Sequence, residues 1–590
     1  MLKNIFRYGW KCYGSVLEIE KLSVEMEGPY FSDSNFTEIV EELNNAYFFS
    51  DNKVVKPAVM VNAPTGKGKT HYIINELRIL AVRFGKKIIY FVNRDPLLKQ
   101  VKLLLLDFDP EVRKLYEKYG CSDDWLKDYN EPIAGVLVMS YQKFYYNHAK
   151  RGEPGYIDPY EYMYLICDEA HYFLDDSKFN PTTERTLQKI IKNFNNVMRI
   201  YISASPDEVI PVIEENEIDM SRGTLSYDCC SGQLSIYYEY RVKLYYYEVP
   251  KSETNYKFMK FQYDSDSKIL FSNIANIIND IGKKEKTLIF VDSKDFGKRL
   301  CKYIQDNCNE IEAAYLDSEQ KNSATYNDIV KSSKFSENVL ITTPVLDNGV
   351  NIKDSELNNI IVLYLDAIKY IQSVGRKRMK KGDTLTIWLP NFDAKYLYKK
   401  KTKILNFKKE LEEAKKDPLD YMYKNYCSGN TSYIRCINRI GNCLEINKFA
   451  EYRNEFELSF INDIIEGYDS DPDFCIKAQL KLLGEEESYN HLGYTRFEFD
   501  LINELKKQYY FTGYQVDKQV VLDDFKALCN KILGDDPTDR PDRSEKPYTM
   551  IRANNLLERH NIPFRFIENG DFVKLTNNCT DDDTNSNEEL

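Results

Sequence analysis

The chain has 590 residues, so at about 150 residues per domain we expect two to four domains with a large total core. Its net charge of -12 excludes a globally basic, histone-like binder of nucleic acid but is compatible with a locally basic groove. Hydrophobic residues make up 43% of the chain, yet no apolar run approaches the roughly 18 residues that span a bilayer, so no membrane segment is expected.

The cysteines and the N-terminus bear on the cellular compartment. The thirteen cysteines form no close repeat, which favours reduced thiols over a disulfide framework. The nearest approach to a cluster, Cys427, Cys436 and Cys443, is spaced too widely for a convincing zinc site, so ordinary buried cysteines are the better interpretation. The first residues include lysines but no apolar stretch with a cleavage site, so we expect no secretory signal and a cytoplasmic location.

Two stretches, at about 55–205 and 285–390, alternate short aliphatic runs with helical patterns, as βαβ units with parallel sheets do. The expected strands of the first stretch are Ala58–Asn62, Lys87–Val92, Ala134–Met139, Tyr164–Cys167 and Met198–Ile202. Those of the second are Lys286–Val291, Asn338–Thr342, Ile360–Leu365 and Thr384–Leu389. We therefore predict an α/β fold with two similar lobes. The aromatic-rich segment 233–263 is expected to be a strand that crosses between them.

The pattern changes after about Tyr396, where a lysine-rich helix that continues to Lys416 opens a mostly helical region, expected to be a separate accessory part. The expected boundaries are a lead-in at 1–54, a first lobe at 55–245, a second lobe at 246–395, the accessory region at 396–579 and a disordered acidic tail at 580–590.

Close to the C-terminus, residues 550–560 predict a helix, and the runs 564–567 and 572–575 around Asn569-Gly570 predict a hairpin. A helix followed by such a hairpin is compatible with a winged-helix contact to duplex DNA. A packing or partner-docking module is the more common use of these elements. The residues that would meet the duplex are Arg552, Arg559, Arg565 and Lys574.

The expected strand at Ala58–Asn62 leads directly into Ala63-Pro-Thr-Gly-Lys-Gly-Lys-Thr70 and then into an apolar helix expected to begin near His71. This order is typical of a phosphate loop, whose glycines let backbone N–H groups surround phosphate oxygens at a helix N-terminus. Lys69 is predicted to reach the β- and γ-phosphates of ATP, and the Thr70 hydroxyl to ligate Mg²⁺. The residues expected to contact ATP in this segment are Thr65, Gly66, Lys67, Gly68, Lys69 and Thr70.

A second apolar strand ends in Asp168-Glu-Ala-His171. Asp168 can hold Mg²⁺ through water while Glu169 polarises the attacking water, the division of labour that phosphoryl transfer requires. A strand followed by acids is often only the start of a solvated loop. Its position downstream of a phosphate loop favours a magnesium-dependent ATP site instead.

With these two elements and several weaker motifs in the same order, residues 55–390 resemble the superfamily 2 helicases, which include the DEAD- and DEAH-box proteins. The further matching segments are 91–100 (motif Ia), 139–142, 201–205 (motif III), 287–293 (motif IV), 341–352 (motif V) and 372–378 (motif VI). The resemblance implies two tandem RecA-like lobes with parallel sheets, followed here by the mostly helical C-terminal accessory region.

The resemblance also implies roles for individual residues. Those implied to contact the nucleic-acid backbone are Asn93, Arg94, Ser140, Gln142, Thr342 and Thr343. Those implied to link hydrolysis to strand movement are His171, Ser203 and Ser205. Gly349 and Asn351 are implied to contact ATP.

Motif VI departs from the usual Gln-x-x-Gly-Arg-x-x-Arg because its second arginine comes one residue early, at Arg378. By resemblance, Gln372, Arg376 and Arg378 face the γ-phosphate across the cleft and stabilise transition-state charge. We assign the arginine finger to Arg378, with Arg376 as co-participant. The alternative is a solvated basic face from Lys377 to Lys381.

The leading hypothesis is an enzyme in which nucleic-acid-stimulated ATP hydrolysis drives translocation or unwinding, with ATP and Mg²⁺ as cofactors and with DNA preferred over RNA by resemblance. Three alternatives stay open: a remodeller that moves on duplex without separating strands, an ATP-gated binding subunit of a larger complex, and an RNA helicase. A small-molecule kinase is disfavoured because it has no need of a second lobe. Protein partners would bind through the C-terminal region.

Overall fold

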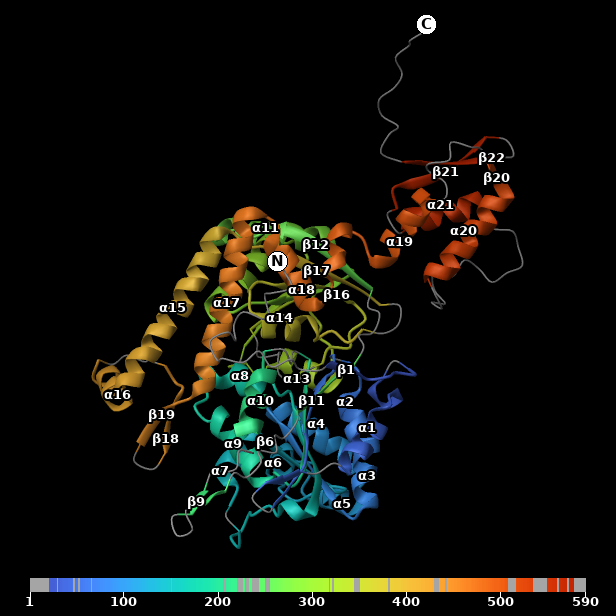
Figure 1. Cartoon of the computed structure of the whole chain (residues 1–590). Helices are drawn as coiled ribbons and strands as arrows, with labels where there is room; N and C mark the ends of the chain where they lie inside the picture. Colours follow the sequence, from blue (N-terminus) through green and yellow to red (C-terminus); the bar gives the residue numbers. More distant parts are fainter. Residues whose placement is uncertain are drawn as a thin grey trace.

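The computed structural model describes two α/β lobes stacked on one another, with helical additions at their sides (Figure 1). The residues that it describes are 21–28, 30–45, 48–50, 53–64, 66–149, 151–204, 208–219, 226–228, 233–235, 244–249, 255–317, 319–320, 323–343, 351–379, 383–428, 434–440, 443–507, 516–533, 549–559, 562–569 and 572–577. No helix within these ranges is both long and apolar enough to cross a membrane.

The first lobe is built on a seven-stranded sheet in the order β1-β11-β4-β8-β7-β5-β6, in which every neighbouring pair is parallel. Its strands are β1 (Lys21–Ser23), β4 (Ala58–Asn62), β5 (Lys87–Val92), β6 (Val136–Ser140), β7 (Tyr162–Asp168), β8 (Met198–Ser203) and β11 (Leu244–Glu248). Alternate residues of β4 enter different cores, Val59 and Val61 on one face and Ala58 and Met60 on the other. The sheet is therefore covered on both faces, as parallel sheets require.

The helices of this lobe connect its strands. They are α1 (Phe36–Asn44), α2 (Lys69–Tyr72), α3 (Arg78–Arg83), α4 (Asp95–Leu106), α5 (Pro110–Lys118), α6 (Asp123–Asp128), α7 (Tyr141–Asn147), α8 (Tyr172–Asp175), α9 (Thr183–Asn193) and α10 (Ile210–Asp219). A π-helical turn joins α2 to α3, so the helix that follows the phosphate loop is continuous.

The second lobe has a six-stranded sheet in the order β12-β17-β16-β13-β15-β14, again with every pair parallel. Its strands are β12 (Asn255–Gln262), β13 (Lys286–Phe290), β14 (Ala313–Leu316), β15 (Val339–Thr342), β16 (Leu357–Val362) and β17 (Thr384–Asn391). Its helices are α11 (Ser267–Ile281), α12 (Lys294–Asn307), α13 (Ala324–Ser332) and α14 (Ala367–Val374). The predicted fold of two tandem RecA-like lobes is confirmed.

The expectation of one strand crossing between the lobes is wrong. Within segment 233–263, β11 pairs with β4 of the first lobe, and β12 pairs with β17 of the second. The lobe-1 sheet thus extends to Glu248, beyond the expected boundary at 245. The expected lead-in also contributes to this lobe, because β1 pairs with β11 and α1 packs into the lobe-1 core.

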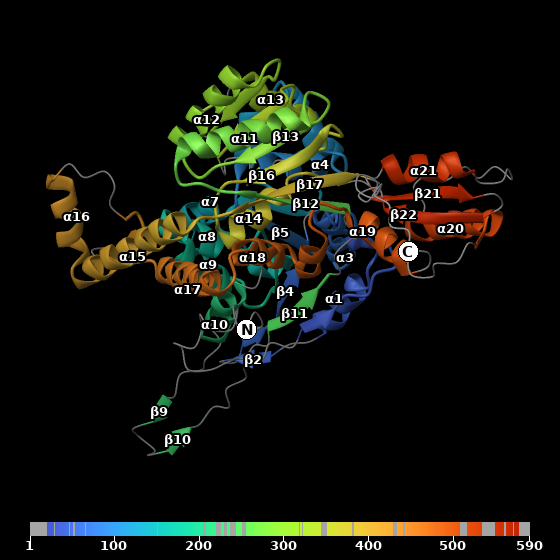
Figure 2. The same cartoon turned by 90° about the horizontal axis from the view of Figure 1, so that it is seen from above.

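The first half of the accessory region packs along both lobes rather than standing apart, which corrects the expectation of a separate part. Its elements are α15 (Ala394–Lys416), α16 (Pro418–Cys427), the hairpin of β18 (Ile437–Ile440) and β19 (Cys443–Ile446), α17 (Lys448–Ser470) and α18 (Phe474–Leu483). Helix α17 places Phe449 in a lobe-1 core and Phe460 in the lobe-2 core. Figure 2 shows α15 and α17 side by side, with α16 at the protruding end of α15.

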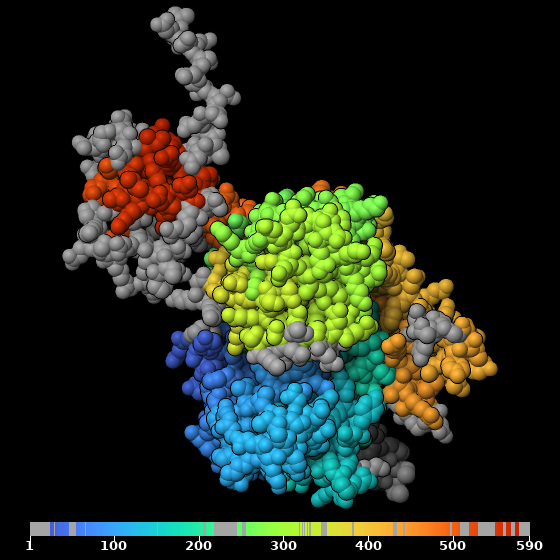
Figure 3. Space-filling view, turned by 180° about the vertical axis from the view of Figure 1, so that it is seen from behind, coloured from blue at the N-terminus to red at the C-terminus, as the bar shows by residue number. Residues whose placement is uncertain are grey.

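The C-terminal elements form a smaller module with a core of its own, which stands off beside the second lobe (Figure 3). They are α19 (Arg496–Leu505), β20 (Val516–Asp517), α20 (Lys518–Leu533), α21 (Met550–Arg559), β21 (Phe564–Asn569) and β22 (Phe572–Asn577). The predicted helix and hairpin are confirmed, and β20 completes a three-stranded sheet. The expected tail at 580–590 lies outside the described residues.

Candidate active site

The loop between β4 and α2 has the backbone of a phosphate loop. Gly66 and Gly68 have φ angles of 88° and 76°, in the left-handed region that favours glycine. The helix begins at Lys69, slightly before the expected start near His71, and the Lys69 Nζ donates a hydrogen bond of 2.9 Å to the Ala63 carbonyl. Thr65 lies outside the described residues. The lysine that should meet phosphate therefore lies across the loop, and among the residues that the structure describes its hydrogen-bond partner is this backbone carbonyl.

The N-terminal segment supports this loop, a contact that the sequence analysis missed. The Phe31 N–H donates to the carbonyl of Lys67 at 2.7 Å, and the rings of Phe31 and Phe36 pack against Tyr72 of α2. The Lys67 side chain is buried, and burial lowers the pKa of its ammonium. The aromatic residues Tyr30, Phe31 and Phe36 ahead of the loop were the available signal.

At the end of β7, the side chain of Asp168 is buried and held by two donors. Its Oδ2 accepts from the Tyr90 hydroxyl at 2.8 Å, and its Oδ1 accepts from the backbone N–H of Glu169 at 3.0 Å. The same Tyr90 hydroxyl lies 3.5 Å from the Thr70 Oγ1. Burial, and next the charge of Glu169, raise the pKa of Asp168 to about 6. Tyr90 thus joins the two side chains predicted to hold Mg²⁺.

Glu169 is held in an unusual backbone conformation, with φ at 51°. A non-glycine residue in this region is strained, and such strain persists mainly where the surroundings impose it. Its Oε2 is buried with no hydrogen-bond partner among the described residues. Burial alone would raise the pKa of Glu169, but the charge of Lys69 and those of Arg376 and Arg378 contribute to lowering the pKa overall. The carboxylate therefore stays ionised, and its Oε2 lies 3.4 Å from the His171 Nδ1.

His171 joins the acid box to motif III. Its Nδ1 lies 3.3 Å from the Ser203 Oγ at the end of β8, and both side chains are buried. Burial lowers the pKa of His171, so the ring is neutral at neutral pH and its contact with Ser203 is a hydrogen bond between uncharged groups. Ser205 lies outside the described residues.

Motif VI is carried by the end of α14 and the chain that follows. The Arg376 Nη2 donates to the Gln372 Oε1 at 2.9 Å, and both side chains are buried. After the helix the backbone is extended, because Ile352 donates to the Arg376 carbonyl and accepts from the Arg378 N–H, each at 2.9 Å. Alternate residues of an extended chain share one face, so Arg376 and Arg378 can face the same side despite the shortened spacing.

Lys377 faces away from these arginines. Its side chain is only 4% exposed, and its Nζ donates to the carbonyl of Asp354. The alternative of a solvated basic face that begins at Lys377 is therefore wrong at that residue.

Arg378 of the second lobe lies over the phosphate loop of the first. A Cβ atom built on Gly66 would be 3.5 Å from the Arg378 Nη1. In the part of the chain that the structure describes, this Nη1, the Gln372 Nε2 and the Asn351 Oδ1 are all buried without a hydrogen-bond partner. Burial, and next the charge of Arg376, lower the pKa of Arg378 to about 10. Gly349 lies outside the described residues. The second lobe thus carries unsatisfied polar groups in motifs V and VI, and one of them, the Arg378 Nη1, lies directly over the loop.

The residues expected to contact nucleic acid lie at or next to the carboxyl ends of β5, β6 and β15, but several have protein partners. The Arg94 Nη1 and Nη2 donate to the Oδ2 and Oδ1 of Asp176 at 2.8 and 2.9 Å. Thr342 is fully buried, and its hydroxyl donates to the Thr343 carbonyl at 2.9 Å. Asn93 and Thr343 are buried as well. The structure therefore gives Thr342 a packing role and Arg94 an ion pair.

Ser140 and Gln142 lie at the start of α7. The Ser140 Oγ accepts from the Lys143 N–H at 3.1 Å and so caps this helix, while Gln142 is partly exposed. Of the expected contacts, Gln142 is the side chain most free to reach a ligand.

The oxygen atoms around Asp168 suit Mg²⁺. This ion usually takes one or two protein ligands and completes its shell with water and phosphate oxygens, so it needs no all-protein cage. Within the described ranges, no group of three His, Cys, Asp or Glu side chains could form such a cage. The Thr70 hydroxyl and the Asp168 carboxylate, which the Tyr90 hydroxyl joins, fit a hydrated Mg²⁺ bound with a nucleotide.

Comparison with known proteins places the lobes in families. Residues 34–208 match the model described as "Type III restriction enzyme, res subunit", and residues 270–379 match "Helicase conserved C-terminal domain". A protein of Sulfolobus islandicus filamentous virus (isolate Iceland/Hveragerdi) that is named as a helicase is 25% identical over 376 residues, which are 59% of this chain and 63% of that protein. The match therefore spans less than two thirds of the viral relative.

Solved helicase structures are similar at a lower level. The DEAD-box helicase Mss116 bound to single-stranded RNA has a TM-score of 0.39 and 13% identity over 62% of this chain and 70% of that chain. The Mycobacterium smegmatis helicase Lhr bound to single-stranded DNA has a TM-score of 0.38 and 15% identity over 57% of this chain and 44% of that chain. The two family-model matches in tandem and the two RecA-like lobes in the same order support a superfamily 2 helicase.

Proposed function

We propose that the protein is an ATP-dependent helicase or translocase that moves along nucleic acid, with DNA preferred over RNA. The observation that carries this proposal is the position of Arg378 over Gly66, where the described residues give its buried Nη1 no hydrogen-bond partner. A nucleotide bound to the phosphate loop alone would need no second lobe. A second-lobe arginine above the loop makes hydrolysis depend on the relative position of the lobes.

The residues at the interface divide the work of hydrolysis. Lys69 would exchange its bond with the Ala63 carbonyl for phosphate oxygens, and the ionised Glu169 would orient and polarise the attacking water. Held by Thr70 and Asp168, Mg²⁺ would neutralise phosphate charge. Arg378 would stabilise the charge that develops on the transferred phosphoryl group, while Arg376 holds Gln372 in place.

The contact between His171 and Ser203 offers a route from hydrolysis to movement. It joins the end of β7 to the end of β8, so a change at the acid box would reach motif III through one hydrogen bond. This supports the roles proposed for both residues, with Ser205 as their neighbour in sequence.

The preference for DNA rests on the resemblance of motif VI and on the C-terminal module. A helix, a short strand, two helices and a hairpin in this order are the elements of a winged helix, and Arg552, Arg565 and Lys574 are all exposed on it. The side chain of Arg559 lies outside the described residues. We propose that these exposed cations meet duplex phosphates.

Two measurements test the substrate and the type of movement. ATP hydrolysis with single-stranded DNA, duplex DNA or RNA should be stimulated most by DNA, and a forked DNA duplex should be separated in a strand-displacement assay. Equal or greater stimulation by RNA would contradict the DNA preference. Stimulation by duplex without strand displacement would favour the remodeller over the helicase.

A further inference from the structure

Helix α17 spans both lobes, although it follows them in sequence. At its N-terminal end, Phe449 and Tyr452 belong to a core cluster of the first lobe, together with Ile368 of α14 from the second lobe. Towards its C-terminal end, Phe460 and Ile464 belong to the core of the second lobe. One continuous helix is therefore embedded in two bodies whose relative position matters for hydrolysis.

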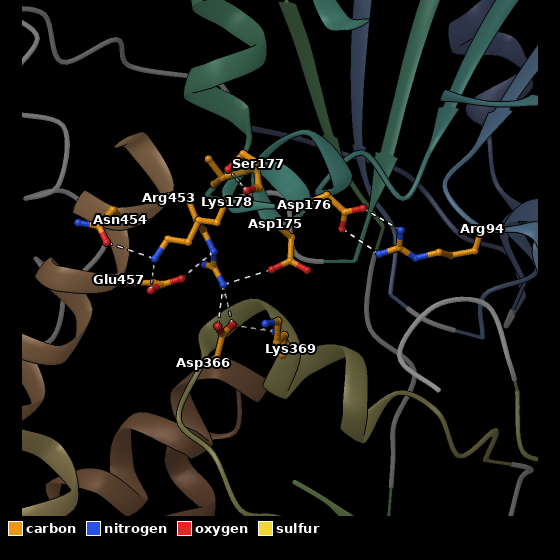
Figure 4. A network of polar contacts seen from close by, with 11 residues as sticks. Arg94, Asp175, Asp176, Ser177, Lys178, Asp366, Lys369, Arg453, Asn454 and Glu457 are labelled. Carbon is orange, nitrogen blue, oxygen red and sulfur yellow. Dashed lines mark hydrogen bonds and ion pairs between the residues drawn. The ribbon is translucent and has the colours of Figure 1, made fainter. Parts of the chain in front are cut away.

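Between these apolar ends, Arg453 is fully buried and joins carboxylates of three different elements (Figure 4). Its Nη2 bonds both Asp366 oxygens at 2.7 and 2.8 Å and lies 3.3 Å from the Asp175 Oδ1, while its Nε lies 3.1 Å from Glu457 of the same helix. Burial alone would lower the pKa of Arg453, but the charges of Asp366 and Glu457 outweigh it and raise the pKa. The arginine therefore stays charged between the lobes.

Two of these carboxylates, Asp175 and Asp366, belong to elements next to the ATP site. Asp175 is the last residue of α8, the helix that follows the acid box. Its neighbour Asp176 accepts two hydrogen bonds from Arg94. Asp366 caps α14, the helix that leads into motif VI, by accepting from the Lys369 N–H at 3.1 Å. Arg453 thus bridges α8, which follows Glu169 in sequence, and the start of α14, which leads to Arg378.

Neighbouring bonds fix the same end of α17 to the first lobe. The Asn447 Nδ2 donates to the Asn180 carbonyl at 2.9 Å and to the Thr183 Oγ1 at 2.8 Å. The Lys178 Nζ bonds Glu457 at 2.7 Å. Because these contacts are short and mostly shielded from water, they hold this end of α17 firmly against the first lobe.

We propose that Arg453 is a positioning residue that holds the two lobes in the closed arrangement, keeping motif VI over the phosphate loop through Asp366 and Asp175. This inference rests on the proposed function. Arg453 touches no substrate atom in this account and acts through the placement of Arg378. The lobes would then be held closed by the chain itself, before nucleotide or nucleic acid binds.

The kinetic test compares the full-length protein with Arg453→Met, Arg453→Lys, Arg378→Ala and the double variant Arg453→Met/Arg378→Ala. We expect Arg453→Met to lower kcat for ATP about 10- to 100-fold, because misplacement of a catalytic group by an ångström costs that much. The KM for ATP should change little, since the phosphate loop lies wholly in the first lobe. Arg453→Lys should have a higher kcat than Arg453→Met, because lysine keeps the positive charge but lacks the several donors of the planar guanidinium.

The double variant separates positioning from a general loss of structure. If Arg453 acts through Arg378, the double variant should be no slower than Arg378→Ala alone. Additive losses would overturn the proposal, as would an unchanged kcat in Arg453→Met. Arg185→Ala is the matched control: its ion pair with Glu445 also joins the accessory region to the first lobe, but both partners are well exposed and kcat should be retained.

The second readout is the distance between the lobes, which does not depend on activity. Spin labels attached to ketone-bearing amino acids in place of Glu111 on α5 and Asp295 on α12, both highly exposed, report this distance without using the cysteines. The wild type without nucleotide should give a narrow distribution, and Arg453→Met a broad one. If Arg453→Met does not fold, Asp366→Asn and Asp175→Asn remove one partner each and should broaden it.

Narrow distributions in all these variants would overturn the inference. If no nucleic acid stimulates the wild-type ATPase, the proposed function fails on its own account. The distance measurement would still decide whether Arg453 holds the lobes together.

Discussion

The guanidinium of Arg378, in the second lobe, lies 3.5 Å from the position that a Cβ atom on Gly66 of the first lobe would occupy. One lobe supplies the phosphate loop, the acid box and motif III, and the other supplies the arginines of motif VI. The proposed ATP site is therefore complete only when the lobes are closed.

The two arginines of motif VI should respond differently to removal. Arg378→Ala should lower kcat about 1,000-fold, the lower range for loss of an arginine finger, and leave the thermal unfolding temperature almost unchanged, because its Nη1 has no hydrogen-bond partner to lose. Arg376→Ala should also lower the unfolding temperature, because the variant loses the bond to Gln372 in a buried site. Steady-state kinetics and thermal unfolding of both variants check this assignment. The reverse pattern would make Arg376 the finger.

Tyr90→Phe should weaken the dependence of hydrolysis on Mg²⁺ in a specific way. The hydroxyl orients Asp168, so its loss should raise the Mg²⁺ concentration for half-maximal activity about tenfold, as loss of an outer-shell partner does at other metal sites. Magnesium titrations of ATPase activity measure this. Tyr201→Phe is the control, since the Tyr201 hydroxyl is buried on the same sheet but bonds Glu217 instead. Equal shifts in both variants would contradict the role of Tyr90.

Arg94 should contribute more to stability than to nucleic-acid binding. Its partner Asp176 has a side chain only 3% exposed, so Arg94→Ala would leave a buried carboxylate unpaired and cost about 3–5 kcal/mol of unfolding free energy. Asp176→Asn in the same chain should restore part of that loss. Urea unfolding of the single and double variants checks the outcome. A stable Arg94→Ala protein with weakened nucleic-acid binding would instead support the role implied by the resemblance.

Acid should destabilise the first lobe through His148. Burial, and next the charge of Lys189, lower the pKa of His148 from 6.5 to about 4. Because the folded pKa lies below the unfolded value, the neutral ring favours folding above pH 6.5, and this contribution is lost as the pH falls through about 4. The ring lies 5.0 Å from that of Phe144, so His148→Phe can keep the packing. Urea unfolding between pH 7 and pH 4 should show a shallower loss in this variant than in the wild type.

Charge reversal on the C-terminal module should separate duplex binding from hydrolysis. Arg552→Glu, Arg565→Glu and Lys574→Glu together should reduce affinity for duplex DNA and make it less dependent on salt, since fewer counterions would be released. The kcat should be retained, because the module has its own core and lies beside the second lobe. Unchanged duplex affinity at low salt would leave this module as a packing or docking unit.

Much of the lobe architecture could be predicted because parallel strands buried on both faces are continuous apolar runs. The expected Ala58–Asn62 and Lys87–Val92 match β4 and β5 at both ends. The packing of α17 could not be predicted, because its apolar residues enter two different cores and show no single hydrophobic face. Among its charged neighbours, Arg453 has the pattern of a surface residue, and only the two lobes together supply its partners.

The same limit applies within the site. The phosphate loop and the acid box can be predicted because their residues are close together in sequence. From the sequence, Tyr90 looks like an ordinary core residue of a buried strand, and only the structure shows its hydroxyl bonded to Asp168. Arg94 and Thr342 were assigned by resemblance to the nucleic-acid surface. Their contacts with Asp176 and with the Thr343 carbonyl depend on how strands end in three dimensions.

The central claim, that nucleic acid and lobe closure control hydrolysis at this site, is tested most directly by steady-state ATP hydrolysis with and without single-stranded DNA. The wild type should be stimulated by DNA, whereas Lys69→Ala and Glu169→Gln should stay near background under both conditions. A wild-type rate that no nucleic acid changes, or normal hydrolysis by both variants, would contradict the account.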